Sequence, residues 1–242
     1  MTGSPIVTAV DLQRRFGEGE AAVDALAGVS LSLPAGAFTA IMGPSGSGKS
    51  TLMHVLAGLD KPTSGTVTID GVDLSTLDDK RLTELRRDKV GFIFQSFNLL
   101  PVLTAAENIE LPLKIAGRSA DGAWRDQLIA TVGLGDRLTH HPSELSGGQQ
   151  QRVAVARALV TKPAVVFADE PTGNLDSTSS GEVLKLLRDA VDTLGQTVVM
   201  VTHEANAAAI ADRVVVLADG KIVHDGAAGT PDEVHDLLRT VA

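Results

Sequence analysis

The sequence predicts an α/β fold, namely a parallel sheet covered on both faces with a helical segment inserted into it. Apolar runs of strand length alternate with helical stretches in the last third of the chain, which is typical of parallel sheets. The middle of the chain, from Thr104 to Val160, is mainly helical instead. Hydrophobic residues make up 43% of the 242 residues, which is enough apolar material for a sizeable core.

The expected elements follow in order along the chain. In the first part the strands are Val29–Leu33, Phe38–Met42, Thr66–Ile69 and Val90–Phe94. Their apolar runs are bounded by turn signals, a Pro-Ala-Gly and an Asp-Gly among them. Asp78–Arg87 is an expected helix, with Ser75 and Thr76 placed to cap it. The last third continues with strand Ala164–Ala168, helix Gly181–Thr193, strand Thr197–Thr202, helix Glu204–Asp212 and strand Arg213–Ala218.

The overall composition narrows the class of protein. The chain has 30 acidic and 21 basic residues, a formal net charge of −9, so it lacks the basic footprint of a general nucleic-acid binder. It has no cysteine, which excludes disulfide frameworks, thiol nucleophiles and cysteine-type zinc sites. No apolar run approaches the length that crosses a bilayer, and no signal peptide is recognisable. We therefore expect a soluble protein of the cytoplasm, without direct membrane insertion and without a nucleic-acid partner.

A glycine-rich loop joins the strand Phe38–Met42 to a helical stretch. Its sequence, GPSGSGKS, satisfies the pattern G-x-x-x-x-G-K-[ST] in the strand-to-helix context that the pattern requires. Glycines let successive N–H groups point at a polyphosphate, and the helix N-terminus adds partial positive charge. Lys49 is predicted to reach the β- and γ-phosphates and Ser50 to ligate Mg²⁺. The predicted nucleotide contacts are Gly43, Pro44, Ser45, Gly46, Ser47, Gly48, Lys49, Ser50 and Thr51.

Two carboxylates follow a buried strand. The run AVVFA ends directly at Asp169 and Glu170. In a P-loop sheet an acidic residue at this place holds Mg²⁺ through its water shell, which is the role predicted for Asp169. Strand alternation points Glu170 elsewhere, as suits a general base that polarises the attacking water.

A second glycine-rich helix start lies about 100 residues after the first. The segment LSGGQQQR precedes the helical stretch Val153–Leu159, and Ser146 is placed to cap it. Two glycines could expose N–H groups to an anion, or the segment could be a helix cap without a ligand. Ser146, Gly147, Gly148 and Gln149 are therefore candidate nucleotide contacts. The two helix starts of one chain need not bind the same nucleotide. In a head-to-tail pair of chains, the LSGGQ segment of one chain could instead close the nucleotide site of the other.

Taken together, these motifs resemble the ATP-binding cassette (ABC) ATPases over essentially the whole chain. GPSGSGKS resembles Walker A, LSGGQQQR the signature and VVFADE Walker B. Gly173–Asp176 resembles the D-loop, Gln95 the Q-loop and His203 the H-loop. The resemblance implies an α/β P-loop NTPase (RecA-like) core with an N-terminal antiparallel β subdomain and an inserted α-helical signature subdomain. The implied boundaries within the single domain 1–242 are 1–95 and 158–242 for the core and 96–157 for the helical part.

The resemblance also implies roles for single residues. ATP and Mg²⁺ are the implied cofactors. Gln95 would join the Mg²⁺ shell and sense the γ-phosphate, His203 would contact that phosphate and organise the attacking water, and Asp176 would communicate between two sites. Phe16 stands where family members carry an adenine-stacking aromatic, usually tyrosine; the alternative is an ordinary core aromatic. The pair His140-His141 favours no metal site, because no matching partner lies nearby.

The stretches GFIFQSFNLLP and DEPTGNLDS resemble the MacB, LolD and FtsE branch of the family. This implies a homodimer with ATP at its interface and a separate MacB/FtsX-like permease, hence a peripheral location on the cytoplasmic face of the bacterial membrane. An FtsE-like regulatory ATPase, which controls an extracytoplasmic hydrolase without moving cargo, is the alternative, and a DNA-repair or translation ABC protein is disfavoured by the acidic charge. The apolar residues between Phe97 and Leu103 are either a permease groove or buried core.

Overall fold

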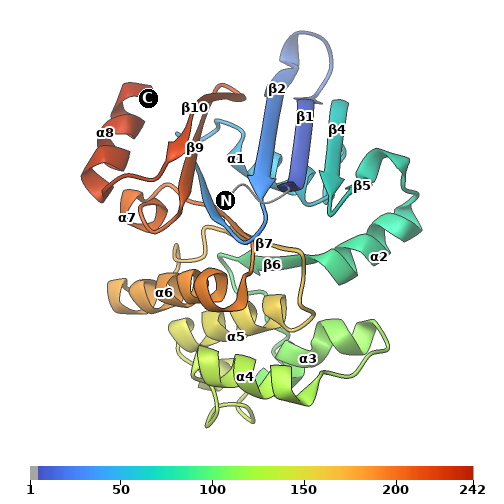
Figure 1. Cartoon of the computed structure of the whole chain (residues 1–242), viewed down its shortest axis with the longest axis vertical. Helices are drawn as coiled ribbons and strands as arrows, with labels where there is room; N and C mark the ends of the chain where they lie inside the picture. Colours follow the sequence, from blue (N-terminus) through green and yellow to red (C-terminus); the bar gives the residue numbers. More distant parts are fainter. Residues whose placement is uncertain (1–4, 242) are drawn as a thin grey trace.

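The computed structural model describes residues 5–241 and contains two sheets and a layer of helices (Figure 1). The strands are β1 (Pro5–Phe16), β2 (Val23–Pro34), β3 (Phe38–Met42), β4 (Ser64–Ile69), β5 (Val72–Asp73), β6 (Val90–Phe94), β7 (Val165–Asp169), β8 (Val198–Val201), β9 (Arg213–Ala218) and β10 (Lys221–Ala227). The α-helices are α1 (Lys49–Leu56), α2 (Asp79–Lys89), α3 (Ala105–Ile115), α4 (Gly122–Val132), α5 (Gly147–Leu159), α6 (Ser177–Leu194), α7 (Ala205–Ala208) and α8 (Pro231–Val241).

The larger sheet has the strand order β10-β9-β3-β8-β7-β6. Its strands β9, β3, β8, β7 and β6 run parallel to their neighbours, and only the edge strand β10 is antiparallel. β3, β7 and β8 are almost completely buried, as expected of parallel strands covered on both faces. The predicted α/β fold with a parallel sheet is confirmed.

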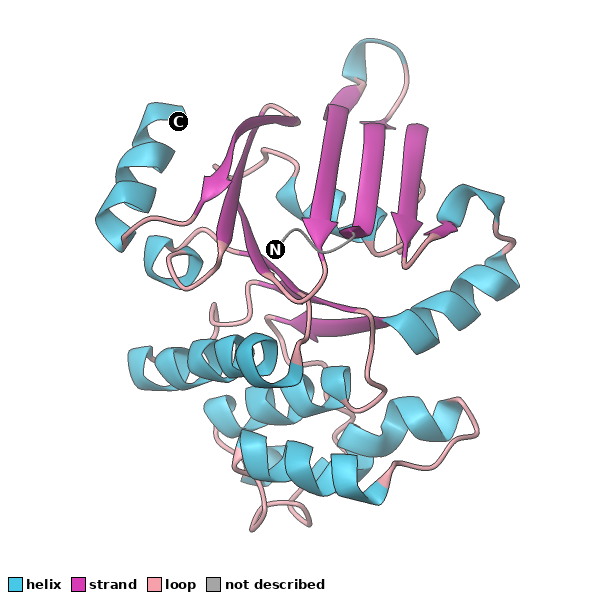
Figure 2. Ribbon diagram, viewed as in Figure 1, coloured by secondary structure: helices cyan, strands magenta, loops and turns pink. Residues whose placement is uncertain are grey.

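The two faces of the parallel sheet are covered by different layers. Alternate residues of one strand enter different cores: Ile41 packs with α1 and the antiparallel sheet, whereas Ala40 and Met42 pack with the helices. The sequence predicted coverage of both faces, and the structure shows that a second sheet shares one of them with α1. Figure 2 shows this sheet and the helical layer on opposite sides of the parallel strands.

The smaller sheet is antiparallel, with the order β2-β1-β4-β5. This is the N-terminal antiparallel β layer that the family resemblance implied. Helices α3, α4 and α5 lie between β6 and β7 in the sequence and together in the lower part of Figure 1. The division at residues 96 and 157 stays a prediction.

Two local predictions differ from the structure. Helix α2 is capped by Asp78, whose carboxylate accepts from the Arg81 N–H at 2.8 Å, because Ser75 and Thr76 belong to a preceding 3₁₀ turn. The expected helix 204–212 is shorter, ending as α7 at Ala208. The sequence reading also gave no range for β10 or α8.

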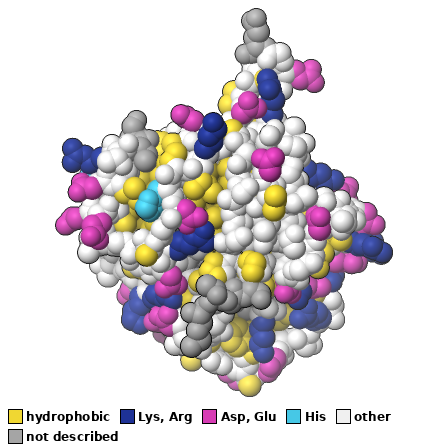
Figure 3. Space-filling view, turned by 45° about the horizontal axis from the view of Figure 1, so that its top comes forward, with side chains coloured by type: hydrophobic (Ala, Val, Ile, Leu, Met, Phe, Trp, Pro, Cys, Tyr) yellow, Lys and Arg dark blue, Asp and Glu magenta, His cyan; other side chains and the backbone are white. Residues whose placement is uncertain are grey.

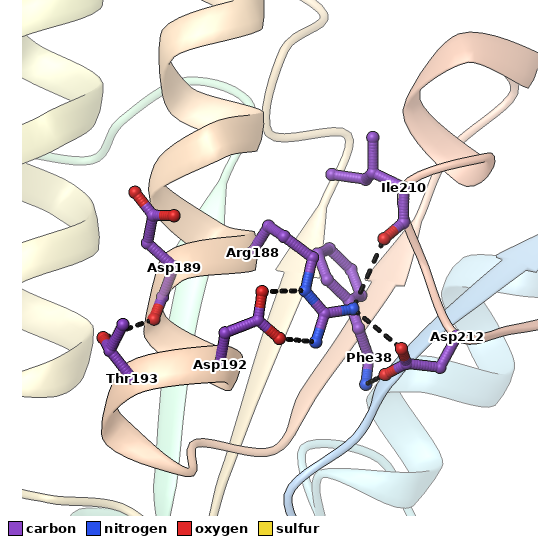
Figure 4. A network of polar contacts seen from close by, with 7 residues as sticks. All are labelled: Phe38, Arg188, Asp189, Asp192, Thr193, Ile210 and Asp212. Atoms are coloured by element: carbon purple, nitrogen blue, oxygen red, sulfur yellow. Dashed lines mark hydrogen bonds and ion pairs between the residues drawn. The ribbon is translucent and has the colours of Figure 1, made fainter.

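A polar cluster around Arg188 fastens α6 to the parallel sheet (Figure 4). The guanidinium donates to Asp192 at 3.1 and 2.6 Å and to Asp212 at 2.9 Å, and it lies 5.6 Å from the centre of the Phe38 ring. Asp212 also accepts from the Phe38 N–H at 2.8 Å. The cluster therefore ties α6 to the first residue of β3 and to the residue before β9.

Acidic and basic side chains are interspersed over the face shown in Figure 3, with hydrophobic side chains between them. Within residues 5–241, no helix combines the length and apolarity needed to cross a membrane.

Candidate functional site

The register of three neighbouring strands brings the ends of the predicted motifs together. Asp169, the last residue of β7, pairs with Phe94 of β6 and with Val201 of β8. Gln95 and Glu170 each follow one of these positions directly, and His203 follows after one more residue. Because the carboxyl ends of parallel strands meet at one edge of a sheet, these side chains share one site.

The loop between β3 and α1 has two positions that only glycine can occupy. Gly43 has a φ of 146°, and an added Cβ would lie 2.1 Å from the Leu217 carbonyl oxygen. Gly48, with φ of 98°, would place a Cβ 2.2 Å from the Ala25 carbonyl oxygen. Gly46 has open space around it, so a ligand could approach its backbone closely. The loop thus has the close packing on one side and the accessible backbone on the other that a phosphate cradle needs.

Lys49, the first residue of α1, points back along this loop. Its ammonium donates to the carbonyl oxygens of Gly43 at 2.8 Å and Pro44 at 2.7 Å. Burial lowers the pKa of Lys49, and the charges of Glu170 and Asp169 oppose that shift. Ile41 of β3 and Asp169 of β7 both pair with Val201 of β8, so the loop that carries Lys49 and the two predicted carboxylates follow strand ends at the same edge of the sheet.

The carboxylate of Asp169 is suited to bind a cation. Burial raises the pKa of this carboxyl, and His54 and Lys49 act against the shift. Its Oδ1 atom is buried and has no hydrogen-bond partner among residues 5–241, and such an atom is costly unless a ligand satisfies it. Among the described residues, no group of three or more His, Asp or Glu side chains is placed to hold a metal ion, so a cation here would need further ligands such as the predicted Ser50 and Gln95 together with phosphate and water oxygens.

Glu170 and His203 contact each other at the same edge. Nδ1 of His203 lies 2.7 Å from a Glu170 carboxylate oxygen. The Glu170 side chain is 22% exposed and that of His203 64% exposed, so the histidine covers the carboxylate from the solvent side. Glu170 has a φ of 47° and donates its N–H to the Val201 carbonyl at 2.9 Å. This backbone directs its side chain away from the line of β7.

Gln95 lies against the segment that resembles the D-loop. Its side-chain amide donates to Asn174 Oδ1 at 3.3 Å, and the Asn174 amide donates back to the Gln95 carbonyl at 3.1 Å. A Cβ on Gly173 would lie 2.6 Å from the Gln95 amide nitrogen, so glycine leaves room for this contact. The structure thus pairs the predicted Q-loop and D-loop through a residue, Asn174, that the sequence reading did not select.

The second helix start has the predicted cap. Ser146 and Gln149 form a capping box at the start of α5, with the Gln149 N–H donating to Ser146 Oγ at 3.2 Å. Gly147 is half-buried and lies near Leu175 and Phe97. Gly148 is buried, and a Cβ there would lie 2.8 Å from Ser179 Oγ, so packing against α6 already requires its small size.

Within one chain the two helix starts are not joined. No hydrogen bond or ion pair of residues 5–241 links Ser146–Gln149 to Gly43–Thr51. Asp176 caps α6 by accepting from the N–H groups of Thr178 and Ser179 at 3.0 Å each. These hydrogen bonds lower the pKa of Asp176. Its predicted part in communication between two sites stays a prediction beside this structural role.

Phe16 ends β1 with 43% of its surface exposed, so it is not a buried core aromatic. The Arg14 guanidinium lies 4.4 Å from the centre of one ring face and is held by two 2.9 Å hydrogen bonds to Asp60. A base stacked on Phe16 would therefore use the other ring face.

The apolar segment after Gln95 is divided between core and surface. Leu99 is partly buried and packs against the helical core, which favours the burial interpretation for this side chain, and the groove interpretation stays a prediction. Phe97 and Leu103 are half-buried. Leu100 is 44% exposed and Val102 is 78% exposed. The outward surface of the segment therefore consists of Leu100 and Val102.

Sequence reasoning missed residues that join motifs across space. Asn174 contacts Gln95 from 79 positions away. His54 interacts with the charge of Asp169, and its position four residues after Ser50 puts both on one face of α1. This spacing was the signal in the sequence that could have identified His54 as a neighbour of the predicted site.

Comparison with known proteins agrees with this geometry. A family model for ABC transporters matches residues 26–173. The macrolide export ATP-binding/permease protein MacB of Marinobacter nauticus is 49% identical over 233 residues, which cover 96% of this chain and 36% of that protein. The chain thus spans about a third of the length of the MacB relatives it matches. An uncharacterized ABC transporter ATP-binding protein of Thermotoga maritima is 49% identical, covering 90% of this chain and 93% of its own length.

Solved structures give the same result. The dimeric structure of the ATP-binding cassette MJ0796 bound to ADP and Pi has 43% sequence identity and a TM-score of 0.82, covering 92% of this chain and 99% of that one. CbiO1 from Clostridium perfringens, part of the ABC transporter complex CbiONQ, has 28% identity and a TM-score of 0.83, covering 98% and 94% of the two chains.

The phosphate loop and the carboxylates at the sheet edge define a P-loop ATPase of the cassette class. The chain belongs to the ABC transporter family, as an ABC ATPase domain.

Proposed function

We propose that this ATPase powers a separate MacB/FtsX-like permease through ATP-driven dimerisation. The observation that carries the catalytic part is that Lys49, Asp169 and Glu170 follow or end neighbouring strands at one edge of the sheet. Loop N–H groups and Lys49 would bind the phosphates of ATP. Ser50, Gln95 and Asp169 would hold Mg²⁺, which neutralises phosphate charge when bound. Glu170 would accept the proton of the attacking water, and His203 would keep that carboxylate oriented.

The dimer follows from the separation of the two helix starts within one chain. A nucleotide held by Gly43–Thr51 would meet Ser146–Gln149 of a second chain, so each site would need both copies. The MJ0796 cassette, described as dimeric with ADP and Pi, supports this arrangement. ATP would close the pair because its phosphates bridge two anion-binding helix starts, and departure of the cleaved phosphate after hydrolysis would remove that bridge.

The permease partner would dock beside β6, α2 and α3. A groove of about 470 Å³ lies there. Its lining includes Leu59, Phe92, Leu111, Pro112, Ile115 and Arg157. Leu59 is 46% and Ile115 70% exposed, and exposed apolar side chains around a concave surface mark partner sites. The outward pair Leu100 and Val102 would extend this surface. The protein would then lie on the cytoplasmic face of the membrane.

Export is the favoured role because MacB proteins of several bacteria are 47–50% identical to this chain. The Thermotoga relative, matched over 93% of its own length, supports a cassette that is separate from its permease. Co-expression with the permease encoded beside this gene tests the proposal: a stable complex with stimulated ATPase activity is expected. No complex and no stimulation would reject the coupling. An FtsE-like role would appear instead as activation of an extracytoplasmic hydrolase.

A further inference from the structure

The backbone directly after Gln95 adopts an uncommon conformation at two consecutive positions. Phe97 has a φ of 58° and Asn98 a φ of 52°. Left-handed backbone is unfavourable for a residue with a side chain, and it persists only where surrounding contacts determine it. The segment that carries Gln95 is therefore held in place by its neighbours.

Besides Asn174, which donates to the Gln95 carbonyl at 3.1 Å, these neighbours include two side chains of α5. The Arg157 guanidinium donates to the carbonyl oxygens of Asn98 at 2.5 Å and Phe97 at 2.8 Å. One turn and a half earlier on the same helix, the buried Gln151 amide donates to the carbonyl oxygen of Phe94 at 3.3 Å. The carbonyl groups on both sides of Gln95 are thus fixed by one helix.

Arg157 is suited to this work by its planar fork, which reaches two acceptors at once. Among the ion pairs of residues 5–241, none involves Arg157, so the guanidinium serves the two carbonyls rather than a carboxylate. It is half-buried and also lines the groove beside β6 and α3. α5 itself begins at the glycine-rich segment capped by Ser146.

We propose that Arg157 is a positioning residue for Gln95, which it holds through the carbonyls of Phe97 and Asn98. This rests on the proposed role of Gln95 in ATP hydrolysis. Its consequence is that the glycine-rich start of α5 and the Gln95 segment move as one unit. Displacement of either would then change where the Gln95 side chain lies relative to the γ-phosphate.

The test is Arg157→Lys, which keeps the charge but loses the fork. We expect kcat to fall about tenfold, the effect of losing roughly one net hydrogen bond, with the KM for ATP changed by less than about twofold. Hydrogen exchange at the amides of residues 96–98 should become faster without nucleotide. Arg125→Lys is the matched control, because Arg125 is a half-buried arginine of the same helical layer that pairs with Glu110.

A double variant with Gln95→Ala separates this role from a general loss of structure. If Arg157 acts through Gln95, then adding Arg157→Lys to Gln95→Ala should cause no further loss of kcat. If the two substitutions reduced kcat independently, so that their effects multiplied in the double variant, the proposal would be overturned. It would also be overturned if Arg157→Lys alone had normal kcat and normal amide exchange while Gln95→Ala was impaired. Normal turnover in Gln95→Ala would overturn the role of Gln95 itself, and the positioning role with it.

A rescue variant tests the backbone part of the argument. Asn98→Gly removes the cost of left-handed backbone at residue 98. Added to Arg157→Lys, it should restore part of the lost kcat and slow the exchange of residues 96–98. A double variant with the same kcat as Arg157→Lys would contradict the proposed clamp.

Discussion

His203 Nδ1 lies 2.7 Å from the Glu170 carboxylate, and the two residues extend from the neighbouring strands β8 and β7. Two backbone features support the contact. The left-handed φ of Glu170 turns its side chain out of the line of β7, and Thr202 Oγ1 accepts from the Glu204 N–H at 3.1 Å, which shapes the turn carrying His203. The pair therefore belongs to the sheet edge itself, and its geometry depends on the pairing of two buried strands.

Glu170→Gln should keep ATP binding and lose turnover. The amide retains the size of the side chain but cannot accept the proton of water, and removal of a positioned general base costs about 10²–10⁴ in rate. Single-turnover hydrolysis and equilibrium binding of ATP measure the two properties separately. Glu182→Gln, at a surface pair with Arg152, is the control. Turnover at the normal rate in Glu170→Gln would show that another group is the base.

Lys49→Ala should weaken nucleotide binding. The ammonium is the cation proposed to face the phosphates, and hydrogen bonds to charged groups are worth about 1.5–3 kcal/mol, so we expect binding weaker by roughly ten- to a hundredfold. Titration with ATP by calorimetry measures this. Lys61→Ala, which removes an exposed ammonium paired with Asp79, should bind ATP normally. Equal affinities of the wild type and Lys49→Ala would exclude Lys49 from the site.

Asp169→Asn should stabilise the protein at neutral pH in the absence of nucleotide and Mg²⁺. Burial raises the pKa of Asp169 in the folded state above its value in the unfolded chain. The protonated carboxyl therefore adds to the free energy of unfolding below the ordinary aspartate pKa. This contribution is lost as the pH rises through the folded-state pKa. The increase in Tm that Asp169→Asn causes relative to the wild type should therefore grow as pH rises. Each kcal/mol of added stability corresponds to about 2–4 °C in Tm. Thermal melts in EDTA between pH 4 and pH 8 measure it.

Asp88→Asn should change the stability at neutral pH in the opposite direction, by lowering it. A hydrogen bond from Arg87 lowers the pKa of Asp88, so the stability it adds is present above the ordinary aspartate pKa and lost as pH falls through the folded pKa. The substitution should cost no more than about 1 kcal/mol at neutral pH, because the pair is exposed to solvent. If both variants shifted Tm in the same direction at pH 8, the account of Asp169 would be wrong.

The sequence could predict much of this site because its residues adjoin strands. Asp169 and Glu170 end an apolar run, and the order of such runs brings their ends to one edge. By contrast, the contacts of Asn174 and Arg157 with the Gln95 segment join positions 79 and about 60 apart, and no local pattern encodes them. β10 and α8 carried local signals that the prediction did not use. The turn Asp219-Gly220 precedes β10, and Thr230, Pro231 and Glu233 form a typical helix start at α8, where the Glu233 N–H donates to Thr230 Oγ1 at 3.3 Å. β10 itself alternates between exposed and half-buried residues at the sheet edge, which is a weak pattern for a strand.

Glu170→Gln with ATP should elute as a dimer in size-exclusion chromatography, and adding Ser146→Arg should return it to a monomer. The reason is that no hydrogen bond or ion pair among the described residues links Ser146–Gln149 to Gly43–Thr51, so we propose that a shared site needs a second copy. A bulky cation at residue 146 would block the approach of that copy. Multi-angle light scattering at several protein concentrations measures the change. A dimer that responds to neither nucleotide nor Ser146→Arg would reject the shared site.

Val102→Glu should separate permease coupling from catalysis. Val102 is 78% exposed, so a carboxylate there stays solvated in the free protein and should change the Tm and basal ATPase activity little. In the complex the same charge would be buried without a partner at an apolar interface, which costs several kcal/mol. We therefore expect loss of co-purification with the permease and loss of its stimulation of the ATPase.

Leu99→Glu is the contrasting variant, because Leu99 packs against the helical core. A charge placed there should lower the Tm and reduce basal activity and permease binding together. Melts and ATPase assays with and without the permease distinguish the two results. If Val102→Glu kept both binding and stimulation, the outward side of this loop would not be a docking surface. The permease contact would then be confined to the groove lined by Leu59 and Ile115.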